Sequence, residues 1–140
     1  MSAAFVVDAS MAFAWILPSQ ASSGADALLE RIEVGDEALV PPLWYLEVAN
    51  GLLAAERRKT IAAPERRLAL ERLSALGLAV DEANARDAFG QTSALAEQYG
   101  LSVYDAVYLE LAIRRALPLG TRDRALQSAA ERSGIPRLDR

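Results

Sequence analysis

The chain has 140 residues, of which 52% are hydrophobic and 24% charged, a size and composition typical of one ordinary globular domain. It contains no cysteine and no histidine, which excludes disulfides, thiolate nucleophiles, imidazole-bound zinc and a Ser-His-Asp triad. Its formal charge of −4 weighs mildly against a generic nucleic-acid-binding domain, which is more often basic. Any catalysis must therefore rest mainly on carboxylates, hydroxyls and arginines, and carboxylate sites favour hard cations such as Mg²⁺ or Mn²⁺.

Short apolar strands alternate with helices along the chain. In chain order we expect a strand at 3–7, helices at 11–17 and 24–33, a strand at 38–40, helices at 43–58 and 64–76, a strand at 78–80, helices at 84–98 and 102–116, a strand at 117–120 and a helix at 121–132, and residues 137–138 could add an edge strand. This alternation predicts an α/β fold with a parallel sheet covered on both faces. No apolar stretch approaches the roughly 20 residues of a membrane span, and no secretory signal is visible, so we expect a cytoplasmic protein.

Asp8 stands at the end of the first strand, where sites of α/β proteins are usually built. Taken alone, it is better explained as an N-cap or turn aspartate leading into the next helix, a role that Ser10 could share.

Glu47 interrupts a largely apolar helix, in which only Glu47 and Asn50 are strongly polar between residues 43 and 55. The two lie three positions apart and so share one helix face. A carboxylate in such a helix is costly unless it is paired, protonated or bound to metal. Pairing with an arginine from elsewhere explains Glu47 as well as metal binding does.

Asp105 and Asp123 also have structural explanations when taken one at a time. Ser102 and Asp105 fit a capping box, while Thr121 can cap the last helix and Asp123 can complement its dipole. Together, however, Asp8, Asp105 and Asp123 all fall at helix starts, which gather at one edge of a parallel sheet. Converging like charges destabilise a fold unless a cation neutralises them, so the pattern suggests an oxygen-only metal site that Glu47 joins from a neighbouring helix.

The remaining acids are expected on polar helix faces. Glu110 and Arg114, for example, have the i, i+4 spacing of a solvated surface pair.

Four segments resemble, in order and spacing, the acidic motifs of PIN-domain ribonucleases, and in particular those of the VapC toxins of bacterial toxin–antitoxin pairs. These segments are Val6–Ser10, Glu47–Asn50, Tyr104–Tyr108 and Leu117–Leu126. The resemblance spans nearly the whole chain. One departure is Gly120, where the family more often has alanine.

This resemblance implies a three-layer α/β/α, PIN-like fold with a central, mostly parallel sheet of about five strands, and a single PIN domain over residues 1–140. It also implies an endoribonuclease dependent on Mg²⁺ or Mn²⁺, the toxin of a VapBC-type pair. RNA would be the substrate, and the implied partners are a cognate VapB-like antitoxin and a second copy in a homodimer.

The family's functional residues carry over by position. The acidic quartet, both catalytic and metal-binding, comprises Asp8, Glu47, Asp105 and Asp123, and the supporting polar residues are Ser10, Asn50 and Thr121. Asp8 and Asp105 would be the principal ligands, with Asp123 completing or water-bridging the coordination. Glu47 would hold a second metal or orient the attacking water, and the number of metals stays open.

Arg122 and Arg124, which flank Asp123, are the better-placed candidates for gripping RNA. Arg57, Arg58 and Lys59 end the long helix, where complementing the helix dipole explains them at least as well.

The aromatic residues Trp15, Trp44 and Tyr45 could line a groove for the antitoxin, although aromatics at helical spacing more often belong to the core.

Two other functions stay open. One is a catalytically silent PIN-like module that binds RNA or protein without cutting. The other is a phosphohydrolase with Asp8 as nucleophile, as in haloacid-dehalogenase-like proteins. Those proteins usually carry a second aspartate two residues later and a catalytic lysine, whereas this chain has Ser10 there and Lys59 as its only lysine.

Overall fold

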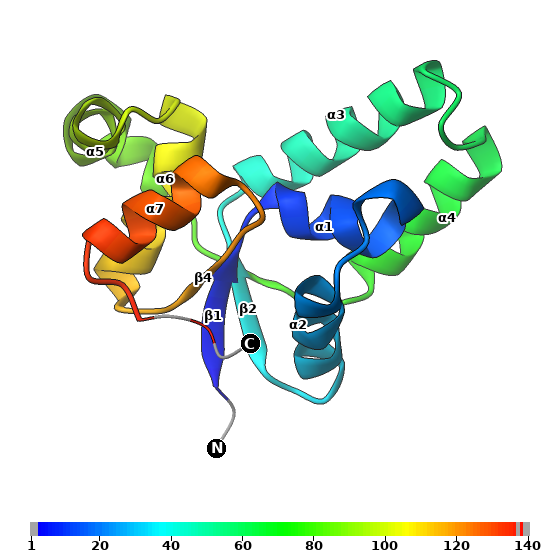
Figure 1. The fold of residues 1–140 in the computed structure, drawn as a ribbon, viewed down its shortest axis with the longest axis horizontal. Coiled ribbons are helices and arrows are strands. Elements are labelled where there is room, and N and C mark those ends of the chain that lie inside the picture. The colour runs from blue at the N-terminus through cyan, green and yellow to red at the C-terminus, as the bar shows by residue number, and fades with distance from the viewer. Residues whose placement is uncertain (1–2, 137, 139–140) are drawn as a thin grey trace.

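A computed structural model describes residues 3–136 and 138 of the protein. Four strands form one parallel sheet in the order β3-β2-β1-β4. They are β1 (Ala4–Val7), β2 (Glu37–Val40), β3 (Ala79–Val80) and β4 (Leu119–Gly120). Helices flank this sheet (Figure 1), so the expected α/β fold with a central parallel sheet is confirmed.

Seven α-helices and three short helical segments lie in this part of the chain. They are α1 (Ala9–Ile16), η1 (Pro18–Gln20), α2 (Ser23–Glu33), α3 (Leu43–Arg57), α4 (Ala63–Ser74), η2 (Ala83–Asp87), η3 (Ala88–Thr92), α5 (Ser93–Tyr99), α6 (Val103–Arg115) and α7 (Arg124–Arg132). Among the described residues, no helix is both long and apolar enough to cross a bilayer.

The sheet has four strands in residues 3–136 and 138, rather than the expected five or so. Of the residues considered for a fifth strand, Leu138 is not in a strand and Arg137 lies outside the described residues.

Most of the expected helices agree with the structure to within two residues at each end, but two differ more. The helix expected at 84–98 is divided into η2, η3 and α5, because Gly90 has a non-helical backbone with φ −107° and ψ −105°. The last helix begins at Arg124 rather than Thr121, because Asp123 is its N-cap and accepts a hydrogen bond from the Leu126 N–H.

β1 lies at the centre of the architecture. Phe5, Val6 and Val7 are fully buried, and the strand pairs with β2 on one side and β4 on the other. A parallel strand with two neighbours and covered faces requires a continuous apolar run, which explains why this segment does not alternate. α6 packs against β1 and β4. The buried strand therefore carries the next residue, Asp8, to the covered carboxyl edge of the sheet.

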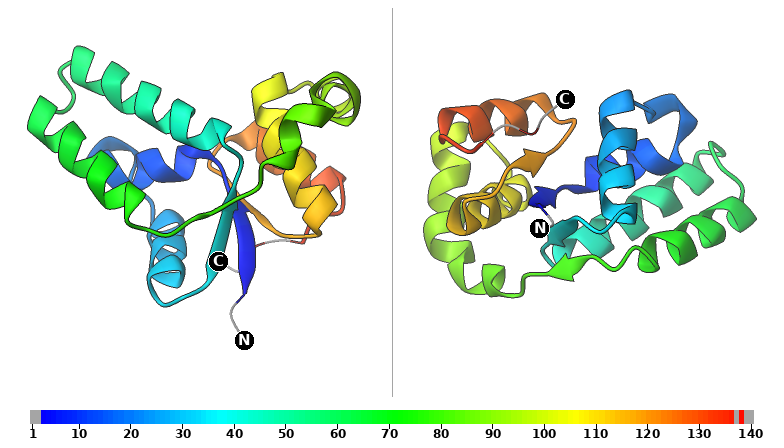
Figure 2. Two further views of the ribbon diagram at one scale, coloured as in Figure 1. Left: turned by 180° about the vertical axis from the view of Figure 1, so that it is seen from behind. Right: turned by 90° about the horizontal axis from the view of Figure 1, so that it is seen from below.

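The close approach of α1 and α3 depends on Gly51. A Cβ atom built on Gly51 would lie only 2.1 Å from Cζ of Phe13, so the ring of Phe13 rests on the backbone of α3. Figure 2 shows α3 and α4 as an antiparallel pair that extends away from the sheet, with α1 beside α3. This contact sets the position of α3, and thus of Glu47, relative to the helix that follows Asp8.

An ion-pair cluster joins the end of α6 to the residue after β3, contrary to the expectation of a solvated Glu110–Arg114 pair. Arg114 donates to Glu110 at 2.7 Å and forms two bonds with Asp81 at 2.9 and 3.0 Å. Arg115 donates to Asp81 at 3.1 Å. Asp81 is 6% exposed and Glu110 is 3% exposed, so the acids of this cluster are buried. The predicted i, i+4 pair of Glu110 and Arg114 is present, but the prediction that it is solvated was wrong.

Replacing Asp81 with asparagine should destabilise the fold in a pH-dependent way. Hydrogen bonds from Arg114 lower the pKa of Asp81 to about 2, below its unfolded value of about 3.9. This stabilisation is present above pH 4 and is lost as the pH falls toward 2. We expect Asp81→Asn to lower the free energy of unfolding by roughly 2–3 kcal/mol at pH 7, a difference that disappears near pH 2.

Urea unfolding at several pH values measures this effect. The exposed neighbour Glu82 provides the matched control, the substitution Glu82→Gln. An equal loss of stability at pH 7 and pH 2 in Asp81→Asn would rule out the charge of Asp81 as the source.

Candidate acidic active site

Four helices begin near the carboxyl end of β1 (Figure 1), and each brings one acidic side chain. Asp8 is the N-cap of α1 and Asp123 the N-cap of α7. Asp105 lies in the first turn of α6, with its N–H bonded to Oγ of Ser102 at 3.0 Å. Glu47 lies near the start of α3. The predicted gathering of helix starts at one edge of the sheet is therefore present.

The carboxylate of Asp8 is 5% exposed and held at both oxygens. Oδ1 accepts a hydrogen bond from Oγ of Ser10 at 2.5 Å and another from the Ser10 N–H at 3.1 Å. Oδ2 accepts a hydrogen bond from Oγ1 of Thr121. The capping role proposed for Asp8 and its position in a site thus coexist, because one oxygen caps α1 and the other receives a donor from the opposite loop.

The same two hydroxyls link the loops on either side of Asp8. Oγ of Ser10 accepts the Arg122 N–H at 2.9 Å, and Oγ1 of Thr121 accepts the Asp123 N–H at 3.0 Å. The Asp8 N–H itself donates to the Gly120 carbonyl at 3.1 Å. The positions of Asp8 and Asp123 are therefore coupled through hydrogen bonds that require β4 to lie beside β1.

Glu47 is partly buried and paired with a phenol. Its Oε1 accepts a hydrogen bond from the hydroxyl of Tyr108, on α6, at 2.5 Å. Tyr108 is 1% exposed. Among the described residues Glu47 has no arginine partner, so the ion-pair explanation that the sequence left open does not apply there.

Burial and mutual charge raise the pKa values of three of these acids. Burial raises the pKa of Asp8 to about 6, with the charge of Asp105 adding to the rise. Burial likewise raises the pKa of Glu47, and Asp105 again adds to it. The pKa of Asp105 is raised by burial and by the charge of Asp123. Asp105 is thus the acid whose charge interacts with each of the other three.

The donor set suits a hard divalent cation, because it offers carboxylate and hydroxyl oxygens and no nitrogen or sulfur ligand. A nearby cation would favour the charged forms whose pKa values burial and repulsion now raise. In the described part of the chain, however, no group of three or more acidic side chains is arranged so that it could hold a metal ion. The fit is therefore one of donor chemistry and mutual charge, and the coordination geometry is not preformed.

The other predicted residues are placed less uniformly. Asn50 is exposed on α3, one turn beyond Glu47. Arg122 donates from its guanidinium to the Gln20 carbonyl, so its side chain anchors the segment after α1. Arg124 is exposed beside Asp123. The basic group at the end of α3 begins ten residues after Glu47, or about 15 Å along the helix, which removes it from the acidic quartet.

The sequence predicts no role for Tyr108 in the site, and it suggests Trp44 only as a residue that could line a groove for the antitoxin. Trp44 is 1% exposed, and its Nε1 donates to the Asp8 carbonyl at 3.1 Å, so it supports Asp8 from within the core. Both aromatics lie three residues from a site acid, Trp44 before Glu47 and Tyr108 after Asp105. That helical spacing is the sequence signal that could have identified them.

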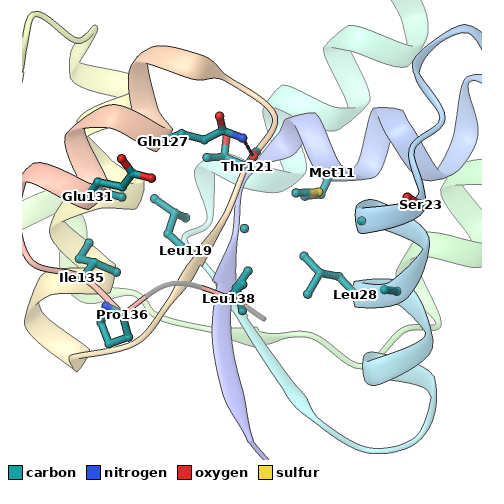
Figure 3. A pocket seen from close by; sticks show the side chains of 14 residues that line it. Met11, Ser23, Leu28, Leu119, Thr121, Gln127, Glu131, Ile135, Pro136 and Leu138 are labelled. Atoms are coloured by element: carbon teal, nitrogen blue, oxygen red, sulfur yellow. Dashed lines mark hydrogen bonds between the residues drawn. The ribbon is translucent and has the colours of Figure 1, made fainter. Parts of the chain in front are cut away.

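A pocket of about 580 Å³ lies on the other side of Thr121, between α2 and α7 (Figure 3). Most of its lining is apolar and includes Met11, Leu28 and Leu119, while Gln127 donates to the Thr121 carbonyl at 2.8 Å. None of the four site acids lines it, so this pocket is separate from the acidic site.

Comparison with models of protein families matches residues 5–132 to the PIN domain. Among solved structures, the chain is similar to PAE2754 from Pyrobaculum aerophilum, with a TM-score of 0.64 and 24% sequence identity. The similarity covers 92% of this chain and 86% of that one. At this identity the likeness supports the fold alone. No protein with curated annotation matches the sequence.

The raised pKa of Asp8 predicts how stability depends on pH without metal. The folded state holds the proton of Asp8 more tightly than the unfolded state, so wild-type stability should fall as the pH rises from about 4 to about 6. Asp8→Asn removes that charge. Its free energy of unfolding, relative to wild type, should therefore increase by about 2–3 kcal/mol across this range.

Chemical unfolding in a chelator at pH 4 and pH 7 measures the change. Asp26→Asn, which removes an exposed carboxylate of α2, is the matched control. An Asp8→Asn effect that is the same at pH 4 and pH 7 would contradict the raised pKa.

Proposed function

The chain belongs to the PIN domain family, and from this membership and the acidic site we propose that it is a metal-dependent endoribonuclease. PIN domains are generally metal-dependent nucleases. The observation that carries the proposal is the placement of Asp8, Glu47, Asp105 and Asp123 near the starts of four helices at one edge of the sheet, where the charge of Asp105 interacts with the other three. Such a concentration of negative charge destabilises the fold by itself, and a bound cation would offset the repulsion between the carboxylates.

In this proposal, Asp8 and Asp105 are the principal ligands of Mg²⁺ or Mn²⁺, and Asp123 and Glu47 complete the acidic set. When bound, the cation supplies Lewis acidity toward the phosphoryl oxygen and stabilises the leaving oxyanion. The chain's own residues fix the ligands. Ser10 and Thr121 hold the two oxygens of Asp8, and Thr121 also sets the loop that presents Asp123.

We further propose that this is the toxin of a VapBC-type pair, a single PIN domain over residues 1–140 that acts in the cytoplasm as a homodimer. The order and spacing of the four motifs support this assignment. A VapB-like antitoxin would block the acidic edge, and a basic side chain is the natural complement to that charge. Arg124, exposed beside Asp123, is the better of the two candidate arginines for contacting RNA.

The residues around Asp8 disfavour it as a covalent nucleophile. Haloacid-dehalogenase-like proteins usually carry a second aspartate two residues after the nucleophile and a catalytic lysine, whereas this chain has Ser10 at that position and Lys59 as its only lysine. The phosphohydrolase alternative therefore has little support.

Cleavage of fluorogenic RNA with Mg²⁺ or Mn²⁺ tests the proposed activity. Asp8→Asn and Asp105→Asn should each lower kcat/KM by about 100-fold or more, because each removes a ligand of a cation worth several kcal/mol in the transition state. Asp26→Asn, which removes an exposed carboxylate on α2, should cleave like wild type. The proposal fails if, on several structured RNAs, wild type cuts no faster than Asp8→Asn and Asp105→Asn.

Metal should also stabilise the folded protein, because the assembled site exists only in the native state. At 100-fold excess over its Kd, Mn²⁺ should add about 2.7 kcal/mol to the free energy of unfolding. Thermal unfolding with and without Mn²⁺ measures this gain, which Asp8→Asn should largely lose. An unchanged melting temperature in wild type, or a full gain in the variant, would argue against metal binding by this site.

A further inference from the structure

The hydroxyl of Tyr108 is a buried polar group directed at the acidic site. Tyr108 is 1% exposed and packs among the buried residues of the hydrophobic core. A phenylalanine ring at this position would fill the same space. A buried phenol hydroxyl needs a partner, which here is Oε1 of Glu47 at 2.5 Å. The hydroxyl therefore contributes a specific contact to an acid of the site rather than packing volume.

We propose that Tyr108 is a positioning residue that fixes the carboxylate of Glu47 beside Asp105, an inference that rests on the proposed nuclease function. Tyr108 and Asp105 lie three residues apart on α6, so they occupy neighbouring positions on one helix face. Glu47 comes from a different helix, α3. α6 therefore positions both acids, because it carries Asp105 and because its Tyr108 holds Glu47 by a hydrogen bond.

The hydrogen bond also determines which oxygen of Glu47 is available. Oε1 is occupied by the phenol, and among the described residues Oε2 has no hydrogen-bond partner. A hydrogen bond to an ionised carboxylate is short and strong, so it restrains the rotation of the carboxyl group. Among the described residues Oε2 keeps both of its lone pairs, so it is the oxygen of Glu47 better able to accept a cation or the substrate.

Positioning of this kind differs from simple packing in its effect on catalysis. Partners that orient a metal ligand typically contribute about 10- to 100-fold to activity or metal affinity. Tyr108→Phe keeps the ring and removes only the bond to Glu47. We expect it to lower kcat by about 10-fold or more, with KM for RNA changed by less than about 2-fold.

A double-mutant cycle with Glu47→Gln tests the inference, with Mn²⁺ affinity measured by calorimetry as a second readout. If Tyr108 acts through Glu47, Tyr108→Phe should reduce kcat or Mn²⁺ affinity in the wild-type background and cause no further loss in the Glu47→Gln background. Tyr99→Phe is the matched control. Tyr99 lies at the end of α5, where its ring faces Arg132, and removal of its hydroxyl should leave both quantities unchanged.

Two results would overturn the inference. In one, Tyr108→Phe leaves kcat and Mn²⁺ affinity at wild-type values. In the other, it lowers them by the same factor with and without Glu47, as a general loss of packing would. If wild type binds Mn²⁺ but cleaves no RNA, the proposed function fails, and the Mn²⁺ measurements still decide the role of Tyr108. If wild type does neither, both proposals fall together.

Discussion

Burial of the Asp8 carboxylate is the constraint on which the site depends. A charge placed at the end of a covered strand needs donors at both oxygens, and Ser10 and Thr121 supply them. Thr121 can reach Asp8 only if β4 pairs with β1, and the same threonine accepts the N–H of Asp123. The hydrogen bonds that the buried Asp8 carboxylate needs therefore also fix the loops that carry Ser10 and Thr121, and with them the position of Asp123. The fold and the site are in this respect a single hydrogen-bonded unit.

The hydroxyl donors offset only part of the electrostatic cost. Asp105 still raises the pKa of both Asp8 and Glu47, so the quartet remains unfavourable to ionise without a counter-charge. Elsewhere in the molecule the solution is different. Asp81 is equally buried, yet two arginines pair with it and lower its pKa to about 2. Asp81 is thus neutralised by neighbouring arginines, whereas the described residues supply no arginine or lysine ion pair to Asp8, Glu47 or Asp105. Under the proposed function, a cation would supply the counter-charge that these acids lack.

Much of this arrangement could be predicted because it follows from local chemistry and one topological rule. The apolar run before Asp8, the proline and glycine boundaries and the helix caps place most elements, and parallel strands bring helix starts together. The remainder depends on contacts between distant residues. Nothing near Glu110 in the sequence indicates that Arg114 would also bind Asp81 and bury both acids. Similarly, the contact of the Tyr108 hydroxyl with Glu47 depends on how α3 and α6 are placed relative to each other.

The position of β4 in the chain has a consequence for the order of assembly. β1 lies in the middle of the sheet, and of its two neighbours β2 follows it closely in the chain, whereas β4, with Thr121 and Asp123 just beyond it, comes after the other three strands. Translation therefore supplies β4 to β1 last among these four strands, and such long-range pairing is slow. Until β4 docks, Asp8 lacks one donor and the acidic set lacks Asp123. The four acids can come together only after the segment that carries Asp123 has been synthesised.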